Sequence, residues 1–172
     1  MNPVTDIINY SLKVLFIGFN PSIRSSETGH HFAGPSNRFW RLLYESGLTV
    51  QRLMPYDDQQ LLRYGYGITN IVPRPTRTAA EITQEEYELG REVLKEKLLA
   101  FQPKIACYVG IGVYRQLSQG RDIRCGLQKN SVVEGVSDFV VSSSSGLNRI
   151  PLKEQLAYFS QLKTLLETEP KY

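Results

Sequence analysis

Hydrophobic positions along the chain fall into short continuous runs and longer periodic stretches. Four continuous apolar runs are typical of strands that are buried on both faces of a sheet. These runs lie at Lys13–Asn20, Tyr66–Val72, Lys104–Gly110 and Asp138–Ser143. Because helical periodicity separates them, the pattern predicts βαβ units, which means an α/β fold with a mainly parallel sheet and helices on both faces.

Helices are predicted where apolar residues recur every three or four positions and capping residues mark the ends. Thr83 and Glu86 match a capping box, so a helix is expected to begin at Thr83. Its predicted buried stripe comprises Tyr87, Val93, Leu94, Leu98 and Phe101. The other expected helices are Ser36–Gly47, with a serine cap and a glycine stop, Asp57–Tyr64, Gly112–Gln119 and Leu152–Thr168.

Two stretches show no clear periodicity. The roughly sixteen residues that follow Asn20 are polar and are expected to form a loop. A hairpin is one interpretation of residues 121–135. The first stretch raises a question of function, because an asparagine and a long polar loop are an unusual ending for a buried strand.

Length and composition predict one globular domain. The chain has 172 residues, of which 41% are hydrophobic and 22% charged, as in an ordinary soluble domain. We expect a single domain over residues 1–172, with its core at about 12–168. The net charge of +3 is compatible with a polyanionic partner without requiring one.

Membrane insertion and secretion are not expected. No apolar run approaches the ~20 residues of a membrane span. The N-terminal segment MNPVTDIINY has neither a basic region nor an apolar core of a signal peptide. The sequence therefore predicts a cytoplasmic protein without a membrane partner.

No metal site and no nucleotide cofactor are predicted. Cys107 and Cys125 are far apart in sequence, and two cysteines cannot complete a four-ligand zinc or iron–sulfur site. They are interpreted as two buried thiols in a reducing cytosol. The glycines at Gly110–Gly112 lack the third glycine of a dinucleotide fingerprint, and Gly29–Ser36 has Pro35 where a P-loop needs lysine.

Polar loops are predicted to converge at one edge of the sheet. In parallel sheets ligands bind at the carboxyl ends of the strands, and polar segments follow Phe19, Ile68 and Val141. Taken separately, Asn20-Pro21 is a turn signal and the serine run at 142–145 is a flexible loop. Together they present small polar groups to the same edge, where we expect the functional site.

The chain has only two histidines, His30 and His31, and they are adjacent. Adjacent side chains usually point apart, so at most one is expected to face a site. The favoured interpretation for each is a loop histidine that is solvated or bonded to backbone. No Ser-His-Asp arrangement is evident.

Five segments of the sequence together resemble a known family. They read GFNPS, TGHHF, GPSNRFW, YGITNIVPRPT and SSSSGLNR, and the resemblance extends from about Val14 to Leu166. The family is that of the mismatch-specific uracil/thymine DNA glycosylases, which belong to the uracil-DNA glycosylase superfamily. The resemblance implies a three-layer α/β/α sandwich with a mainly parallel central sheet.

The resemblance also implies a reaction. The expected activity is hydrolysis of the N-glycosidic bond of uracil, and in some relatives thymine, paired with guanine, which leaves an abasic site for base excision repair. The implied partner is double-stranded DNA with a G·U or G·T mispair, and the implied protein is a monomer that needs no cofactor. Whether thymine is accepted stays open, since serine runs like this one also occur in relatives active on thymine.

Matching positions imply residue roles. Asn20 corresponds to the residue that positions the attacking water, and Phe32 to the aromatic side chain that stacks on the extruded base. The implied base-binding set is Phe19, Ser22, Ser25, Phe32 and Asn70. The implied DNA-binding wedge is Ser143, Ser144, Ser145, Gly146, Leu147, Asn148 and Arg149.

Departures from the family leave alternatives open. Many relatives have glycine where this chain has Ser22, and other branches of the superfamily use an aspartate in the first motif and a histidine in the last. Core packing is the alternative for Phe32, and phosphate or the orphaned guanine are alternatives for Arg149. The arginines expected at the active edge are Arg24, Arg74, Arg77 and Arg149.

Two other function classes compete with a glycosylase. A catalytically silent lesion-binding module would keep Phe32 and Leu147 without a competent Asn20. A nucleoside hydrolase acting on free nucleosides would have no use for the Gly-Leu-Asn-Arg wedge. The full motif around Asn20 favours the DNA glycosylase.

Overall fold

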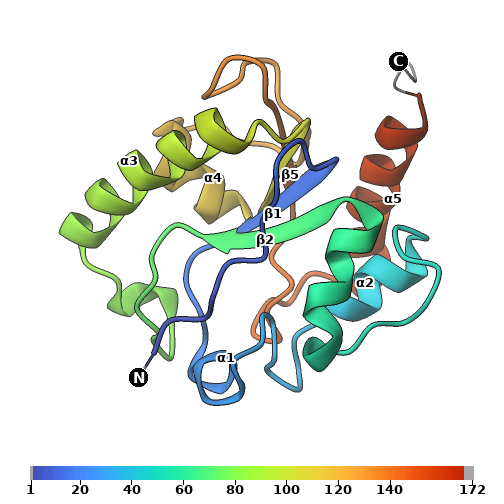
Figure 1. Cartoon of the computed structure of the whole chain (residues 1–172), viewed down its shortest axis with the longest axis horizontal. Helices are drawn as coiled ribbons and strands as arrows, with labels where there is room; N and C mark the ends of the chain where they lie inside the picture. The colour runs from blue at the N-terminus through green and yellow to red at the C-terminus, as the bar shows by residue number, and fades with distance from the viewer. Residues whose placement is uncertain (1, 169–172) are drawn as a thin grey trace.

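The structure is a computed structural model and describes residues 2–168. A five-stranded sheet forms its centre, with the strand order β2-β1-β3-β5-β4 (Figure 1). The first four of these strands run parallel and β4 runs antiparallel to β5. The strands are β1 (Val14–Gly18), β2 (Tyr66–Asn70), β3 (Ile105–Val109), β4 (Gly126–Leu127) and β5 (Ser137–Val141). The predicted α/β class with a mainly parallel sheet is confirmed.

Helices cover both faces of the sheet (Figure 1). Successive strand residues point to opposite faces, so Phe16 packs in one apolar cluster with α2 and α5, and Ile17 packs in the other with α3 and α4. These helices are α2 (Phe39–Glu45), α3 (Gln84–Phe101), α4 (Ile111–Ser118) and α5 (Leu152–Thr168). The arrangement has three layers, and it explains why the strands read as continuous apolar runs.

Local signals located α3 and α5 well. The predicted capping box is present, because Thr83 Oγ1 accepts from Glu86 N–H at 3.2 Å and the Glu86 carboxylate accepts from Thr83 N–H at 3.0 Å. The predicted buried stripe of α3 is wrong at Val93, which is 45% exposed. Gly90 and Arg91 lie on the buried face instead. A Cβ on Gly90 would lie 2.2 Å from the Ile71 carbonyl oxygen, so the helix passes close to the loop after β2.

The expectation of an uninterrupted loop after Asn20 is wrong. A short helix, α1 (Ile23–Thr28), lies within it. Ser22 caps this helix by accepting from Ser25 N–H at 3.0 Å, and Gly29 ends it with a left-handed φ of 76°. The helix has six polar or β-branched residues and no apolar stripe, which is why periodicity did not reveal it.

Three further boundaries differ from the prediction. The helix α2 begins at Phe39, not Ser36, because Asn37 Oδ1 accepts from Phe39 N–H at 3.0 Å. The predicted 57–64 helix is a 3₁₀ helix, η1 (Pro55–Tyr64). Residues 121–135 form no hairpin of their own, since β4 pairs with β5. A second 3₁₀ turn, η2 (Ala79–Glu81), precedes α3.

The carboxyl ends of the parallel strands meet at one edge of the molecule. The segment with α1 follows β1, the segment that leads to η2 follows β2, and residues 142–149 follow β5 (Figure 1). Within residues 2–168, no helix is long and apolar enough to cross a bilayer.

Candidate active site

A cleft of about 470 Å³ opens where these three segments meet. Its volume is that of a small-molecule site. The predicted residues that line it are Phe19, Asn20, Ser22, Ser25, Phe32, Asn70, Ser143, Ser144, Ser145, Leu147 and Asn148. Gly146 and Arg149 belong to the same loop but do not line the cleft. The structure therefore brings together most of the residues selected from the sequence.

The side chain of Asn20 is held in one orientation. Its Nδ2 donates to the Arg74 carbonyl oxygen and to Thr76 Oγ1, each at 2.7 Å. Thr76 Oγ1 in turn donates to the Thr78 carbonyl oxygen at 2.7 Å, so it can only accept from Asn20. Both amide hydrogens are thereby used. The Asn20 carbonyl oxygen is left as a hydrogen-bond acceptor in a cleft-lining residue.

Thr76 is a site residue that the sequence analysis did not select. Replacing it in Thr76→Val removes the acceptor while keeping the shape of the side chain. For the activity that the resemblance implies, we expect base excision to slow by about 10- to 100-fold, the scale of losses from small misplacements of a reacting group. Single-turnover rates and DNA affinity measure this, with Thr76→Ser as the control that restores the rate. A rate in Thr76→Val equal to that of the wild type would contradict the positioning role.

Phe32 lines the cleft and also packs on the core. Its ring stacks on Phe39 with centroids 4.1 Å apart and planes 23° apart. The residue has a left-handed φ of 50°, which is rare for a side chain of this size. The ring therefore packs on the core and also borders the cleft, and its stacking on an extruded base stays a prediction.

Gly18 allows Asn70 and Phe32 to approach the end of β1. A Cβ at Gly18 would lie 2.8 Å from Asn70 Oδ1 and 3.9 Å from Phe32 Cζ. The amide of Asn70 and the tip of the Phe32 ring therefore converge on the same strand end. This pair is suited to recognise a flat polar ring by one amide and one aromatic surface.

Three members of the implied base-binding set mainly shape the loop. Ser25 is buried, and its Oγ accepts from Ala33 N–H at 3.1 Å and from Ser22 Oγ at 3.1 Å. The ring of Phe19 packs in the apolar layer beneath α3 and α4, where it meets Tyr87 with centroids 6.2 Å apart. Their side chains hold the walls of the cleft in place.

The backbone carbonyl oxygens of the serine loop accept hydrogen bonds from the start of α2 and from a side chain of α5. The Ser143 carbonyl oxygen accepts from Asn148 Nδ2 at 2.7 Å and from Gln155 Nε2 at 2.6 Å. The Ser144 carbonyl oxygen accepts from Arg38 N–H at 2.9 Å. Asn148 therefore folds the loop back on itself. Leu147, at the tip of the loop, is 80% exposed.

Arg38 and Gln155 form a brace that sequence reasoning missed. Arg38 Nη1 donates to Gln155 Oε1 at 2.8 Å and to the Ile150 carbonyl oxygen at 3.2 Å. Gln155 is fully buried, so its amide has no water to replace these partners. Gly146 packs so closely on the segment before α2 that a Cβ would lie 2.2 Å from Ser36 Oγ. The loop is thus held in place before any ligand binds.

The arginines expected at this edge differ in whether their charge is already paired with a carboxylate. Arg74 makes two hydrogen bonds of 2.8 Å to the Glu86 carboxylate, and this contact lowers the pKa of Glu86 to about 2. Arg74 thus contributes its backbone oxygen to Asn20 while its charge is paired. Arg77 lines the cleft, and Arg149 is exposed outside it.

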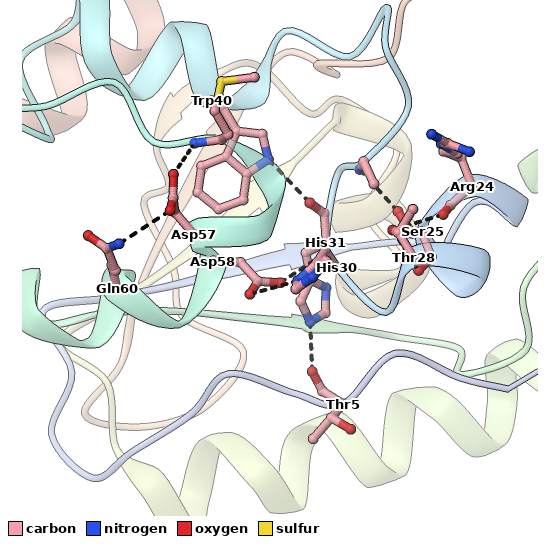
Figure 2. A network of polar contacts seen from close by, with 12 residues as sticks. Thr5, Arg24, Ser25, Thr28, His30, His31, Trp40, Asp57, Asp58 and Gln60 are labelled. Atoms are coloured by element: carbon pink, nitrogen blue, oxygen red, sulfur yellow. Dashed lines mark hydrogen bonds and ion pairs between the residues drawn. The ribbon is translucent and has the colours of Figure 1, made fainter.

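The two histidines belong to a structural network at the wall of the cleft (Figure 2), and of the two only His31 lines the cleft. Asp58 is buried and bridges them, because its Oδ1 lies 3.2 Å from His30 Nδ1 and its Oδ2 accepts from His31 N–H at 3.1 Å. His31 Nε2 lies 2.8 Å from the Thr5 carbonyl oxygen, and Trp40 Nε1 donates to the His31 carbonyl oxygen at 3.2 Å. The favoured interpretation of a histidine bonded to backbone fits the His31 ring, whereas the His30 ring contacts the Asp58 carboxylate instead.

Burial lowers the pKa of His31 from its usual value of 6.5. The unfolded chain therefore binds a proton near pH 6.5 that the folded chain does not, and stability falls as pH drops through that value. We expect a lower free energy of unfolding at about pH 5.5 than at about pH 7.5. Urea unfolding of His31→Gln should show a smaller pH dependence than that of the wild type. His30→Gln serves as the control, and an equal effect in both variants would contradict the assignment.

No group of three or more metal-ligating side chains occurs within residues 2–168. The lining residues of the cleft carry amide, hydroxyl and aromatic groups together with the imidazole of His31 and the guanidinium of Arg77.

Comparison with known proteins agrees with this geometry. A solved structure with a similar fold is that of a candidate uracil DNA glycosylase from Methanosarcina acetivorans, determined by solution NMR. It superimposes with a TM-score of 0.66 at 20% sequence identity, over 96% of this chain and 98% of the other. The sequence pattern of the uracil DNA glycosylase superfamily matches residues 5–167. The chain belongs to the uracil DNA glycosylase superfamily.

Proposed function

We propose that this protein is a monofunctional DNA glycosylase that removes uracil mispaired with guanine. The observation that carries the proposal is the fixed Asn20 amide, whose free carbonyl oxygen belongs to the same cleft as Phe32 and the serine loop. Membership of the superfamily supports the activity on uracil in DNA. We further propose that the protein acts as a monomer in the cytoplasm, in base excision repair.

Asn20 is proposed to place a water molecule for attack on the sugar. Breaking the glycosidic bond builds positive charge on the sugar and negative charge on the departing base. An amide is no general base, but its oxygen accepts a hydrogen bond and so orients a water molecule. This is sufficient where the bond breaks before the nucleophile attacks. Asn70 and nearby backbone N–H groups are proposed to hold the base as its charge develops.

Selectivity for a mispair follows from the balance of energies. Extruding a base costs a few kcal/mol, and one aromatic stack returns ~1–3 kcal/mol. Phe32 alone does not strongly favour extrusion of a well-paired base. A wobble pair is cheaper to open, and Leu147 is proposed to fill the space that the extruded base leaves.

A nicking assay tests the proposal. Duplexes with G·U, G·T and A·U pairs are incubated with the protein and then treated with alkali, which cleaves abasic sites. Cleavage at G·U and not at A·U is expected, and the G·T duplex tests activity on thymine. Retarded DNA without cleavage would instead identify a silent lesion-binding module. Release of base only from free nucleosides would identify a nucleoside hydrolase.

The variant Leu147→Ala tests whether Leu147 acts in base extrusion rather than in breaking the glycosidic bond. We expect excision from a G·U duplex to slow by about 10-fold or more. Extruding the base costs a few kcal/mol, and alanine no longer offsets the part of this cost that the leucine side chain is proposed to offset. Excision from single-stranded DNA should be unchanged, since no gap in a stack needs filling. Leu89→Ala, at an exposed leucine on α3, is the matched control. Equal slowing on both substrates would contradict a wedge role.

A further inference from the structure

A second cavity lies beside the cleft, and the proposed reaction does not use it. It has a volume of about 320 Å³ and shares Phe32 and Asn37 with the cleft. The rest of its wall comes from α1, the segment before α2, α2 itself and residues 52–56. Four of its residues are labelled in Figure 2, namely Arg24, Thr28, His30 and Trp40.

The charged groups on this wall are arginines. Arg24, Arg41 and Arg52 line the cavity, and no carboxylate does so within residues 2–168. Arg24 lies 3.8 Å from Glu27 and Arg41 lies 2.8 Å from Glu45, whereas no ion pair of Arg52 occurs in the described chain. Exposed pairs of this kind are weak. A phosphate group offers the guanidinium groups a stronger partner through two parallel hydrogen bonds.

Exposed apolar side chains lie among these arginines. Tyr56 is 70% exposed and Met54 is 41% exposed, and both line the cavity. Trp40 also lines the cavity, and its indole is buried. Aromatic surfaces next to basic groups are how proteins bind single-stranded nucleic acid, with bases stacked and phosphates paired. A purely apolar ligand would leave the arginines without a role.

We propose that this cavity binds the nucleotide next to the extruded one on the same DNA strand. A strand whose base enters the cleft must continue past Phe32 and Asn37, which form the shared wall. The neighbouring base then stacks on Tyr56 and Met54, and its phosphate pairs with the arginines. This inference rests on the proposed function, because it needs an extruded nucleotide in the cleft.

Photo-cross-linking tests the position of that nucleotide. Two single-stranded oligonucleotides carry a tetrahydrofuran abasic analogue, with 5-iodouracil on its 5′ or its 3′ side. We expect one of them to cross-link to a peptide that contains Tyr56 or Met54. Wild-type protein that binds both oligonucleotides but cross-links elsewhere overturns this inference alone. Failure to bind either oligonucleotide also overturns this inference, whereas the proposed function is tested separately by cleavage of the G·U duplex.

Matched variants test the contribution of each kind of contact. Tyr56→Ala should weaken binding to the same oligonucleotides by about 5- to 150-fold, the effect of losing one base stack. Tyr10→Ala, at a tyrosine with 69% exposure outside both cavities, should leave the affinity unchanged.

Arg52→Glu should weaken binding and make the slope of log affinity against log salt shallower by about 0.7, the value per phosphate on single strands. Arg63→Glu makes the same charge change on an exposed face of η1. Equal affinities and slopes in Arg52→Glu and Arg63→Glu would overturn the proposed phosphate contact. Circular dichroism verifies that each variant is folded.

Discussion

Asn20→Ala is expected to abolish most of the excision activity and to leave DNA binding nearly intact. The rate should fall by about 10²–10⁴-fold, the range for loss of one positioned catalytic group. Alanine removes the oxygen that would orient the water molecule, while the 142–149 loop keeps its own hydrogen bonds to Arg38 and Gln155. Single-turnover excision from a G·U duplex measures the rate. Affinity for a duplex with an abasic analogue measures binding.

The control for this experiment is Asn130→Ala. Asn130 is an exposed asparagine outside the cleft, so the same truncation there should change neither rate nor affinity. Unchanged excision in Asn20→Ala would remove this residue from the reaction. A parallel loss of affinity and rate would instead indicate that Asn20 holds the substrate rather than the water.

Phe39→Ala is expected to have the largest effect on stability. Phe39 is fully buried and contacts the rings of Phe16, Phe32, Trp40 and Phe159. Truncating such a residue lowers the free energy of unfolding by about 3–5 kcal/mol. At ~2–4 °C for each kcal/mol in a domain of this size, the melting temperature should fall by roughly 6–20 °C. Urea and thermal unfolding measure these quantities.

Activity should also fall in Phe39→Ala at temperatures where the protein is still folded, because the ring of Phe32 loses the surface on which it stacks. Phe159→Ala is the matched control. Phe159 is equally buried in the same cluster and forms no ring pair with Phe32 in the described chain. We expect a similar loss of stability in Phe159→Ala with nearly normal excision. Similar activity in both variants would contradict the coupling between the core and the cleft.

The sequence predicted the sheet and the edge at which the cleft lies, because these depend on local signals. Continuous apolar runs located the strands. The carboxyl ends of parallel strands lie at the same edge of a sheet, whatever the positions of the strands in the sequence. The capping box at Thr83 and Glu86 fixed the start of α3 by contacts between residues three positions apart. Such signals can be recognised in the sequence alone.

Contacts over long sequence separations were not predictable in the same way. Thr76 is 56 positions from the Asn20 side chain that it orients, and Gln155 is 117 positions from Arg38. No periodicity or cap marks either pair. Thr76 does close the segment YGITNIVPRPT, which resembled the family, and that position was the available signal. The short helix α1 was hidden because its residues carry no apolar stripe.

The bracing of the 142–149 loop has a consequence for how the protein meets DNA. Ordering a flexible backbone costs about 1–2 kcal/mol per residue. Because this loop is already ordered in the folded protein, DNA binding does not have to order it. If Leu147 is the wedge that we propose, it would reach the duplex as a rigid probe. The slow event in a search along DNA would then be the spontaneous opening of each base pair, and pairs that open readily would be captured first.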